Sequence, residues 1–433
     1  MSKTIYDVIG IGIGPYNLGL AALLDETELS GAFFDDTPRF EWHPGMLIDG
    51  MDLQVPFIAD LTTFADPKSP YTFMNYLHEH NRMFPFFFHQ QFKIPRQEYN
   101  HYLQWVAEQL SGLHFNHLIV DVIDHSDHYE VIALNKETEE TVSCFSKHVV
   151  LGTGSKPIIL DGMDDLPAND VIHTSRYLFE KENLLQSKHV TVVGSGQSAL
   201  EVFLDLLEEQ KRHDMKLTLL SRTGGLFQLD QAKFAQEFFT PEYVDYFHSL
   251  SFEQRQKNLE TLSALRKGID PDTLTRLYSE LYHKTAGGKK SHVLINPMTE
   301  VKSIEREGTG YKLNCQQWQE EQEFSYQTDK VILATGYKPN IPDWFMERFQ
   351  EKIKWEDDKR FKVTRDYRLD FKEERGHHFF TLTNLVHSHG AGATNLGLAV
   401  TRNVHIINKI AGRELYEEQP HSAFQTFSMN DFS

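Results

Sequence analysis

Cysteine is almost absent from this chain of 433 residues, which contains only Cys144 and Cys315. Two distant cysteines supply neither a disulfide framework nor the ligand spacing of a zinc site. Long apolar runs are missing as well, since no segment reaches the roughly 18 unbroken apolar residues that span a membrane. The apolar start of the chain is too short for a signal peptide. We therefore expect a cytoplasmic protein without a membrane span.

Basic residues are also scarce, because 43 Lys and Arg face 62 Asp and Glu and give a formal net charge of -19. Such a chain repels nucleic acid and anionic membranes, so neither is expected as a partner. Between residues 40 and 67 the deficit is complete, with no Lys or Arg at all. The same stretch still carries Glu41, Asp49, Asp52, Asp60 and Asp66. A cationic small molecule would meet no repulsion there.

Two distant segments share one pattern, in which an apolar run leads through a glycine turn into a helix. The first runs from IYDVIGI (5–11) into LGLAALLDE, and the second runs from HVTVVG (189–194) into LEVFLDLLEEQ. Each is the opening of a βαβ unit in a parallel, doubly wound sheet. We predict an α/β fold with two dinucleotide-binding, Rossmann-like domains. Residues 229–290 are predicted to be mostly helical.

The first glycine turn has the features of an FAD site. Gly12 permits the tight turn, and Gly14 lets phosphates approach the backbone ahead of Pro15. Asn17 stands where a third glycine often sits, so the match is imperfect. Asp35 follows the next strand, where a carboxylate would accept ribose hydroxyls. The alternative is a glycine turn with a structural role alone.

The second turn, Gly194 to Ser198, differs in the strand that follows it. The turn also contains Gly196 and Gln197, and the next strand leads to Arg222 instead of an acid. An arginine pairs with the 2′-phosphate that an acid would repel, so this turn is predicted to bind NADPH. The alternative for Arg222 is an ordinary surface arginine.

These assignments define the expected domains. Residues 1–180 and 338–433 are predicted to form the FAD-binding domain. Residues 181–228 and 291–337 are predicted to form the NADPH-binding domain. The helical segment 229–290 is predicted to be an insertion on the substrate side.

Longer motifs resemble those of the flavin-dependent N-hydroxylating monooxygenases, which hydroxylate amines for hydroxamate siderophores. The motifs are GxGPxN (12–17), FEWHPGML (40–47), LQVPFIADL (53–61), DPKSPYTFMNYL (66–77), GSGQSALE (194–201) and LATGY (333–337). The resemblance runs nearly end to end. It implies that NADPH reduces FAD, that O2 forms a C4a-hydroperoxyflavin, and that a neutral primary amine attacks its distal oxygen. It also implies a homo-oligomer, a tetramer in relatives.

The resemblance further assigns residues to the flavin site. Gln54 is implied to lie beside the flavin ring as the catalytic-site residue. The other implied cofactor contacts are Trp42, His43, Met46, Thr335, Gly336, Tyr337, Asn395 and Leu396. The alternatives are core packing for Trp42 and Met46, and a buried, backbone-satisfying side chain for Gln54. No metal site is expected, since the histidines near the C-terminus lack an ordered ligand spacing.

Position 59 indicates the substrate. Relatives that act on ornithine or lysine resemble MQxxFLKDL, and their Lys looks like the partner of the substrate carboxylate. Ala59 replaces it here, and an unpaired carboxylate in a closed pocket costs about a few kcal/mol. We predict N-hydroxylation of a short diamine, cadaverine or putrescine, in a pocket that includes Gln54 and Ala59. Histamine, lysine and ornithine are alternatives, the last two if another cation replaces the Lys; a non-catalytic NADPH-sensing flavoprotein is a distant one.

Overall fold

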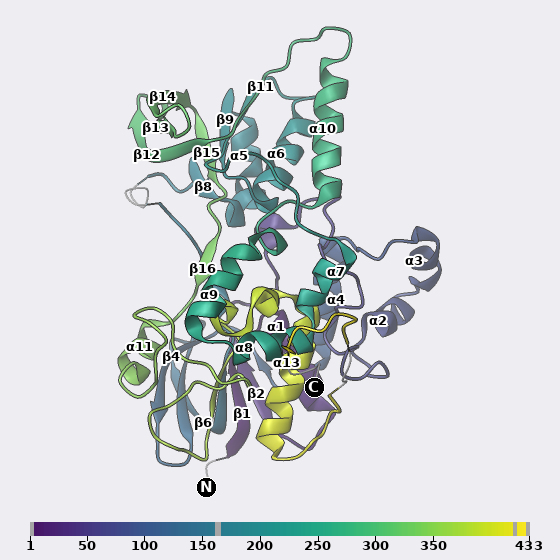
Figure 1. Ribbon diagram of the computed structural model, residues 1–433, viewed down its shortest axis with the longest axis vertical. Coiled ribbons are helices and arrows are strands. Elements are labelled where there is room, and N and C mark those ends of the chain that lie inside the picture. The colour runs from purple at the N-terminus through teal and green to yellow at the C-terminus, as the bar shows by residue number, and fades with distance from the viewer. Residues whose placement is uncertain (1–3, 161–165, 419–421, 430–433) are drawn as a thin grey trace.

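The computed structural model describes residues 4–160, 166–418 and 422–429, and its two α/β lobes follow one another along the long axis (Figure 1). The lower lobe in Figure 1 contains both ends of the described chain, and the upper lobe is formed from the middle of the chain. The predicted α/β class with two Rossmann-like units is confirmed.

The lower lobe is built on a seven-stranded sheet. Its order is β3 (Leu113–His114), β2 (Gly31–Phe34), β1 (Ile5–Ile11), β6 (Thr141–Leu151), β5 (Tyr129–Asn135) and β4 (His117–Asp124), with β17 (Phe379–Thr381) beside β6. β1 pairs in parallel with β2 and β6, whereas β5 and β4 are antiparallel. Because β17 joins this sheet, segments from both ends of the chain build the lower lobe.

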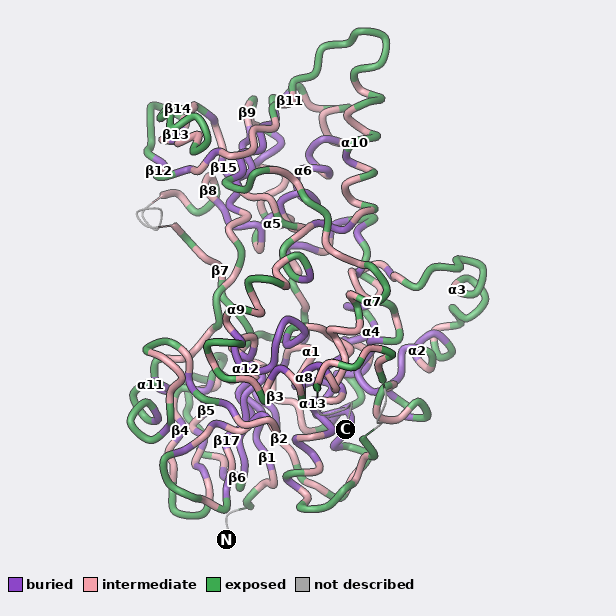
Figure 2. Tube along the Cα trace, viewed as in Figure 1, coloured by how far each residue is buried: buried purple, intermediate pink, exposed green. Residues whose placement is uncertain are grey.

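Helices of the lower lobe pack around α1 (Pro15–Asp25), which contacts α13 (Leu396–Ala411) and α4 (Arg96–Gln109). α1 is apolar nearly all round because it lies between the sheet and other helices. α11 (Asp343–Phe349) packs on β4, and α12 (Val386–His389) precedes α13. α2 (Phe73–Glu79) and α3 (Met83–His89) lie at the side of the lobe, and α3 contains no buried residue (Figure 2).

The upper lobe contains a five-stranded parallel sheet. Its order is β11 (Val293–Asn296), β10 (Lys216–Leu220), β9 (His189–Val193), β15 (Lys330–Leu333) and β8 (Val171–His173). α5 (Tyr177–Leu185) and α6 (Gln197–Glu209) share a core with this sheet. A separate antiparallel sheet comprises β12 (Thr299–Glu307), β13 (Gly310–Gln317) and β14 (Gln322–Thr328).

Two features link the lobes. The first is a ribbon in which β7 (Ser155–Pro157) pairs with β16 (Tyr337–Pro339). The second is the predicted helical segment, which is confirmed as α7 (Lys233–Gln236), α8 (Pro241–Ser249), α9 (Phe252–Thr261) and α10 (Pro271–Thr285). α8 and α9 contact α12 of the lower lobe, whereas α10 contacts α6 of the upper lobe.

The domain boundaries remain a prediction. β8 precedes the expected boundary at residue 180 and yet pairs with β15 of the upper lobe. No helix among the described residues is both long and apolar enough to pass through a membrane.

Candidate active site

The first glycine turn connects β1 to α1. Gly12 has a φ of +87°, and a Cβ there would lie 2.5 Å from the carbonyl oxygen of Gly152, so only glycine is accommodated. Gly14 caps α1 without a side-chain hydrogen bond, Pro15 is the first helical residue, and a Cβ on Gly14 would meet nothing within 4 Å. The start of α1 is therefore open, as anion binding at a helix N-terminus requires.

Asn17 strengthens this turn, although it departs from the glycine pattern. Its Nδ2 donates to the carbonyl oxygens of Gly12 at 2.7 Å and Ile11 at 3.3 Å. The side chain has room because residue 152 is glycine, where a Cβ would lie 2.4 Å from Nδ2 of Asn17. Asn17 thus fixes the turn to the start of α1 through two hydrogen bonds.

Asp35 lies just after β2 and faces the same turn. Its Oδ2 accepts a hydrogen bond from the backbone N–H of Ile13 at 2.7 Å, and its Oδ1 accepts from the N–H and hydroxyl of Thr37. A carboxylate has about four acceptor positions, so one remains for a ribose hydroxyl. Asp35 therefore combines a structural role with the predicted cofactor contact.

The second turn repeats the geometry of the first. Gly194 has a φ of +146°, and a Cβ there would lie 2.5 Å from the carbonyl oxygen of Ala334. Gly196 caps α6 without a side-chain hydrogen bond, and a Cβ on it would meet nothing within 4 Å. Ser198 lies half-buried in the first turn of α6. Both turns therefore present an uncapped helix N-terminus.

Arg222 lies just beyond β10. Its side chain is 76% exposed and forms an ion pair of 3.4 Å with Glu300. The indole N–H of Trp318 donates to the carbonyl oxygen of Arg222 at 2.7 Å, which fixes the backbone. Exposed ion pairs contribute little energy, so the guanidinium can turn toward a phosphate.

The segment containing Trp42, His43 and Met46 lies between the lobes. Gly45 packs so closely on the upper lobe that a Cβ there would lie 2.0 Å from the carbonyl oxygen of Ser175. Met46 is 4% exposed and belongs to the upper-lobe core. Trp42 packs against Tyr99, with ring centroids 5.4 Å apart. These contacts agree with the packing alternative for Met46 and Trp42, and their cofactor contacts remain predictions.

His43 is neutral at physiological pH. The residue keeps an exposed surface, but the neighbouring rings of Trp42 and Tyr337 take part of the imidazole out of water. This desolvation, followed by the positive charge of Arg96, lowers the pKa of His43 to about 4. The ring lies 6.1 Å from that of Tyr337, whose own pKa is raised by burial.

The LATGY motif forms the exit from the upper lobe. Gly336 has a φ of +86°, and its carbonyl oxygen accepts from the N–H of Ile158 at 3.0 Å. The hydroxyl of Thr335 donates to the carbonyl oxygen of Ile158, and Tyr337 begins β16 of the ribbon. These residues therefore hold the connection between the lobes, and their contact with a cofactor remains a prediction.

The predicted substrate-pocket residue Ala59 lies against the start of α13. It is 5% exposed, and its Cβ lies 3.7 Å from the position of a Cβ on Gly397. Asn395 caps α13 by accepting from the N–H of Gly397 at 2.8 Å, and Leu396 lines a cavity of about 10 Å³ beside it. Gln54 is half-buried, and its side chain has no hydrogen-bond partner among the described residues. The amide of Gln54 is thus available to a ligand.

Asp60, next to Ala59, faces into the scaffold. Its carboxylate accepts from the N–H groups of Thr62, Thr63 and Phe73 at 3.1, 2.7 and 2.7 Å, and from the Thr63 hydroxyl at 2.6 Å. A carboxylate has about four acceptor positions, and these hydrogen bonds occupy all of them. Asp60 therefore holds this segment to the start of α2, and its carboxylate has no position left for a substrate ammonium.

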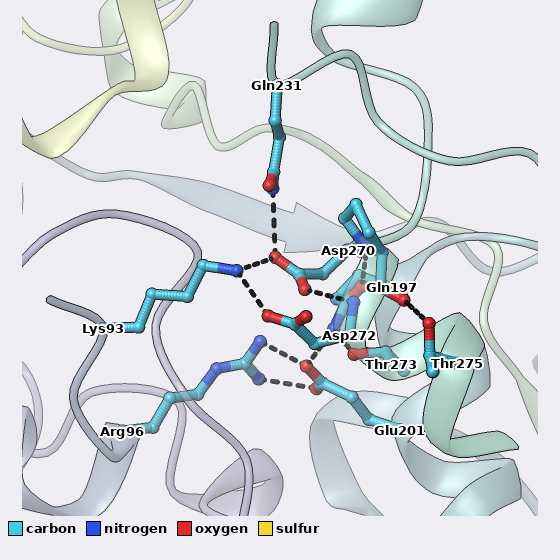
Figure 3. Close-up of polar contacts among 10 residues, drawn as sticks. Lys93, Arg96, Gln197, Glu201, Gln231, Asp270, Asp272, Thr273 and Thr275 are labelled. Atoms are coloured by element: carbon cyan, nitrogen blue, oxygen red, sulfur yellow. Dashed lines mark hydrogen bonds and ion pairs between the residues drawn. The ribbon is translucent and has the colours of Figure 1, made fainter. Parts of the chain in front are cut away.

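An ionic contact that was not predicted from the sequence joins the two lobes (Figure 3). Arg96, the first residue of α4, donates to both carboxylate oxygens of Glu201 on α6, at 2.6 and 2.7 Å. Lys93 donates to Asp270 at 2.7 Å and to Asp272 at 3.1 Å. The one available signal was an acid, Glu201, within the apolar run of α6.

Gln197 links this network to the second glycine turn. Its Nε2 donates to Glu201 at 2.7 Å, and its Oε1 accepts from the N–H of Asp270 at 2.9 Å. The predicted cofactor contact of Gln197 thus coincides with an observed structural role (Figure 3).

Two glycine turns, each leading from a parallel strand into an uncapped helix, and the half-buried amide of Gln54 fit a two-dinucleotide oxidoreductase of the monooxygenase class. The model of the L-lysine 6-monooxygenase/L-ornithine 5-monooxygenase family matches residues 4–339, and the chain belongs to this family. The expected relation to the N-hydroxylating monooxygenases is confirmed.

Individual relatives cover almost the whole chain. The putrescine N-hydroxylase of Shewanella oneidensis is 36% identical over 435 residues, which is 99% of this chain and 85% of the relative. The FAD-bound cadaverine monooxygenase DfoA of Erwinia amylovora has a TM-score of 0.93 at 35% identity and covers 98% of this chain and 99% of its own. The ornithine N-hydroxylase KtzI of Kutzneria sp. 744, with reduced FAD, NADP+ and L-ornithine, has a TM-score of 0.88 at 25% identity, with 94% and 99% covered.

Proposed function

We propose that this protein hydroxylates one primary amine of a short aliphatic diamine, cadaverine or putrescine, with FAD, NADPH and O2, for hydroxamate siderophore biosynthesis. The substrate assignment depends mainly on Ala59, which is buried against Gly397. Relatives that use amino acids resemble MQxxFLKDL in this segment and have a Lys at this position. Similarity to a putrescine N-hydroxylase and to a cadaverine monooxygenase supports the same choice.

The residues present fit both cofactors. Gly12, Gly14 and Asp35 would hold FAD at the open start of α1. Gly196 and Arg222 would hold the pyrophosphate and 2′-phosphate of NADPH at the start of α6. When bound, the flavin supplies the redox and oxygen-transfer chemistry, which no side chain can provide.

The protein's task is to present a neutral amine. An alkyl ammonium has a pKa near about 10.4 in water, so the pocket must favour loss of its proton. Burial of the amine beside Ala59 would act in this direction, because desolvation disfavours the charged form. Gln54 Oε1 would accept a hydrogen bond from the amine N–H and orient its lone pair. The same enclosure would exclude water from the reaction.

L-Lysine N6-hydroxylation is a second candidate, and Arg402 is the observation that favours it. Arg402 is 1% exposed, lies with its guanidinium carbon 4.8 Å from the ring centroid of Tyr16, and donates to the carbonyl oxygen of Ala393 at 2.6 Å. Its Nε and Nη1 have no partner among the described residues. A buried cation on α13 could pair with a carboxylate in place of the missing Lys.

Direct product analysis separates these candidates. The FAD-loaded protein is supplied with NADPH and cadaverine, putrescine, histamine, lysine or ornithine, and the hydroxylamine is measured by mass spectrometry. Product from a diamine, with none from lysine or ornithine, is expected. Product from lysine that disappears in Arg402→Met would establish the second candidate. Bound FAD without NADPH-dependent oxygen consumption would instead indicate a sensor.

We also infer a homo-oligomer, a tetramer by resemblance to relatives, and a cytoplasmic location. Both cysteines are free, as a reducing compartment allows. Light scattering would test the assembly, with an expected mass of four chains of 50.3 kDa each.

A further inference from the structure

A cluster of exposed aromatic side chains lies on and just after α3. Phe84, Phe87, Phe88 and Phe92, here called the α3 surface, are 75%, 66%, 72% and 70% exposed. α3 contains no buried residue and projects from the lower lobe (Figures 1 and 2). Single exposed apolar residues are common, but a cluster of this kind marks an interaction site.

The α3 surface is held in place by aromatic contacts. Phe86, on the other side of α3, packs on Phe57 and Phe73 with ring centroids 5.0 and 5.8 Å apart. Phe57 donates its backbone N–H to the carbonyl oxygen of Phe92 at 2.8 Å, and the two rings stack at 6.0 Å. The chain therefore fixes α3 through one ring and directs the neighbouring rings outward.

The distribution of charge indicates which partner can bind to the α3 surface. Residues 83–92 contain no Asp, Glu, Lys or Arg, in a chain with a formal net charge of -19. Two copies repel each other over most of their surfaces, and an uncharged apolar face is where that repulsion is smallest. The same net charge opposes approach to an anionic membrane.

The available area is close to what a stable dimer needs. A phenylalanine can bury about 150–250 Å², so four rings with these exposures offer roughly 400–700 Å². A standard interface buries about 800 Å² on each partner. The α3 surface alone would supply most of one side.

We propose that the α3 surface is a self-association interface, in which α3 of one copy packs against α3 of a second copy around a two-fold axis. A two-fold contact is self-complementary, so one apolar face suffices on each copy. This proposal deepens the inferred homo-oligomer by naming its surface. Because Phe92 contacts Phe57, the second copy would also support residues 53–61, which include Gln54 and Ala59.

Sedimentation velocity of the full FAD-loaded chain tests this interface over a range of concentrations. The variant Phe84→Gln/Phe88→Gln removes two rings that point outward and leaves Phe86 in place. The control is Phe179→Gln/Phe227→Gln, at positions that are 62% and 66% exposed elsewhere. We expect the dissociation constant to rise at least tenfold in the first variant and to stay unchanged in the control. FAD content and circular dichroism verify that both variants fold.

Three results would overturn the proposal. If the unmodified chain is monomeric at every concentration, both the inferred homo-oligomer and the proposed interface are refuted. If Phe84→Gln/Phe88→Gln leaves the oligomer unchanged, the homo-oligomer is supported but the α3 surface is not its interface. A monomer that floats with phosphatidylcholine vesicles would assign the α3 surface to lipid. Diamine hydroxylation is measured separately, so its failure would not be confused with any of these results.

Discussion

Arg96 and Glu201 join the two lobes through two hydrogen bonds of 2.7 and 2.6 Å, and the side chain of Glu201 is only 1% exposed (Figure 3). Burial raises the pKa of Glu201, while the charge of Arg96 opposes that rise. The pair links α4 of the lower lobe to α6, whose N-terminus is the second glycine turn. It therefore bears on how two cofactors, one on each lobe, would face each other.

Replacing Arg96 tests that relationship. Arg96→Met leaves the buried Glu201 with the amide of Gln197 but without its cationic partner, and breaking a buried pair costs about 3–5 kcal/mol. A shift of about 1 Å between reactants can slow a reaction about 100-fold, so we expect flavin reduction by NADPH to slow on that scale. Stopped-flow absorbance measures the reduction, and FAD binding should remain. Arg39→Met, in an exposed pair with Glu41, is the control. Normal reduction in Arg96→Met would show that the pair does not position the lobes.

The charge at position 59 is expected to control substrate choice. Ala59→Lys would place an ammonium in the pocket and repel a diamine, so KM for cadaverine or putrescine should rise at least roughly tenfold. Ala59→Met adds similar length without charge and separates crowding from repulsion. The measurement is hydroxylamine formation against substrate concentration. If Ala59→Lys and Ala59→Met raised KM for the diamine equally, side-chain volume and not charge would explain the change.

Arg222 is expected to distinguish NADPH from NADH. Arg222→Gln should raise KM for NADPH roughly tenfold, because a charge-assisted hydrogen bond to the 2′-phosphate is lost. KM for NADH should stay unchanged. Glu300→Gln removes the competing partner of Arg222 and should lower KM for NADPH. Steady-state kinetics with both nucleotides provide the comparison. If KM for NADH rose equally, the assigned contact of Arg222 with the 2′-phosphate would be refuted.

Restoring the glycine pattern at position 17 is expected to weaken FAD binding. Asn17→Gly loses the two hydrogen bonds to the turn, each worth about 0.5–1.5 kcal/mol. It also places a flexible glycine in α1, so the FAD dissociation constant should rise roughly tenfold. Fluorescence titration measures it. Asn17→Asp keeps the size but removes the donor, and should weaken FAD similarly; tighter binding by Asn17→Gly would contradict this account.

Acid is expected to destabilise the protein through buried neutral histidines. Burial, followed by the charge of His378, lowers the pKa of His148 from 6.5 to about 3, and the backbone N–H of His378 donates to His148 Nδ1 at 2.9 Å. Because the folded pKa is the lower one, this contribution is complete above pH 6.5 and is lost as pH falls toward 3. His148 alone should cost about 2 kcal/mol between about pH 6.5 and 5.

Urea unfolding at several pH values measures this loss. His148→Asn keeps an acceptor for the His378 N–H and should flatten the dependence on pH, whereas His125→Asn, at an exposed position, should not. An unchanged slope in His148→Asn would mean that other groups govern acid stability.

Local patterns predicted the parts of this protein that depend on neighbouring residues. The strand, turn and helix at Gly12 and Gly194, and the helical segment 229–290, follow from periodicity and glycine geometry. Sequence could not predict contacts between distant segments. Arg96 and Glu201 are separated by 105 positions, and neither local sequence indicates the other. Met46 belongs to the upper-lobe core because the chain crosses between lobes there, which apolar spacing cannot reveal.

The occupied carboxylate of Asp60 has a consequence for selectivity. A pocket bounded by Ala59 and by the fully hydrogen-bonded Asp60 would discriminate by exclusion: it would disfavour a substrate carboxylate without binding the remote ammonium of a diamine. One methylene changes binding in an apolar pocket by only about 1–3 kcal/mol. Homologous diamines would then compete according to their abundance. The length of the final product would be decided by the cell's diamine supply more than by this enzyme.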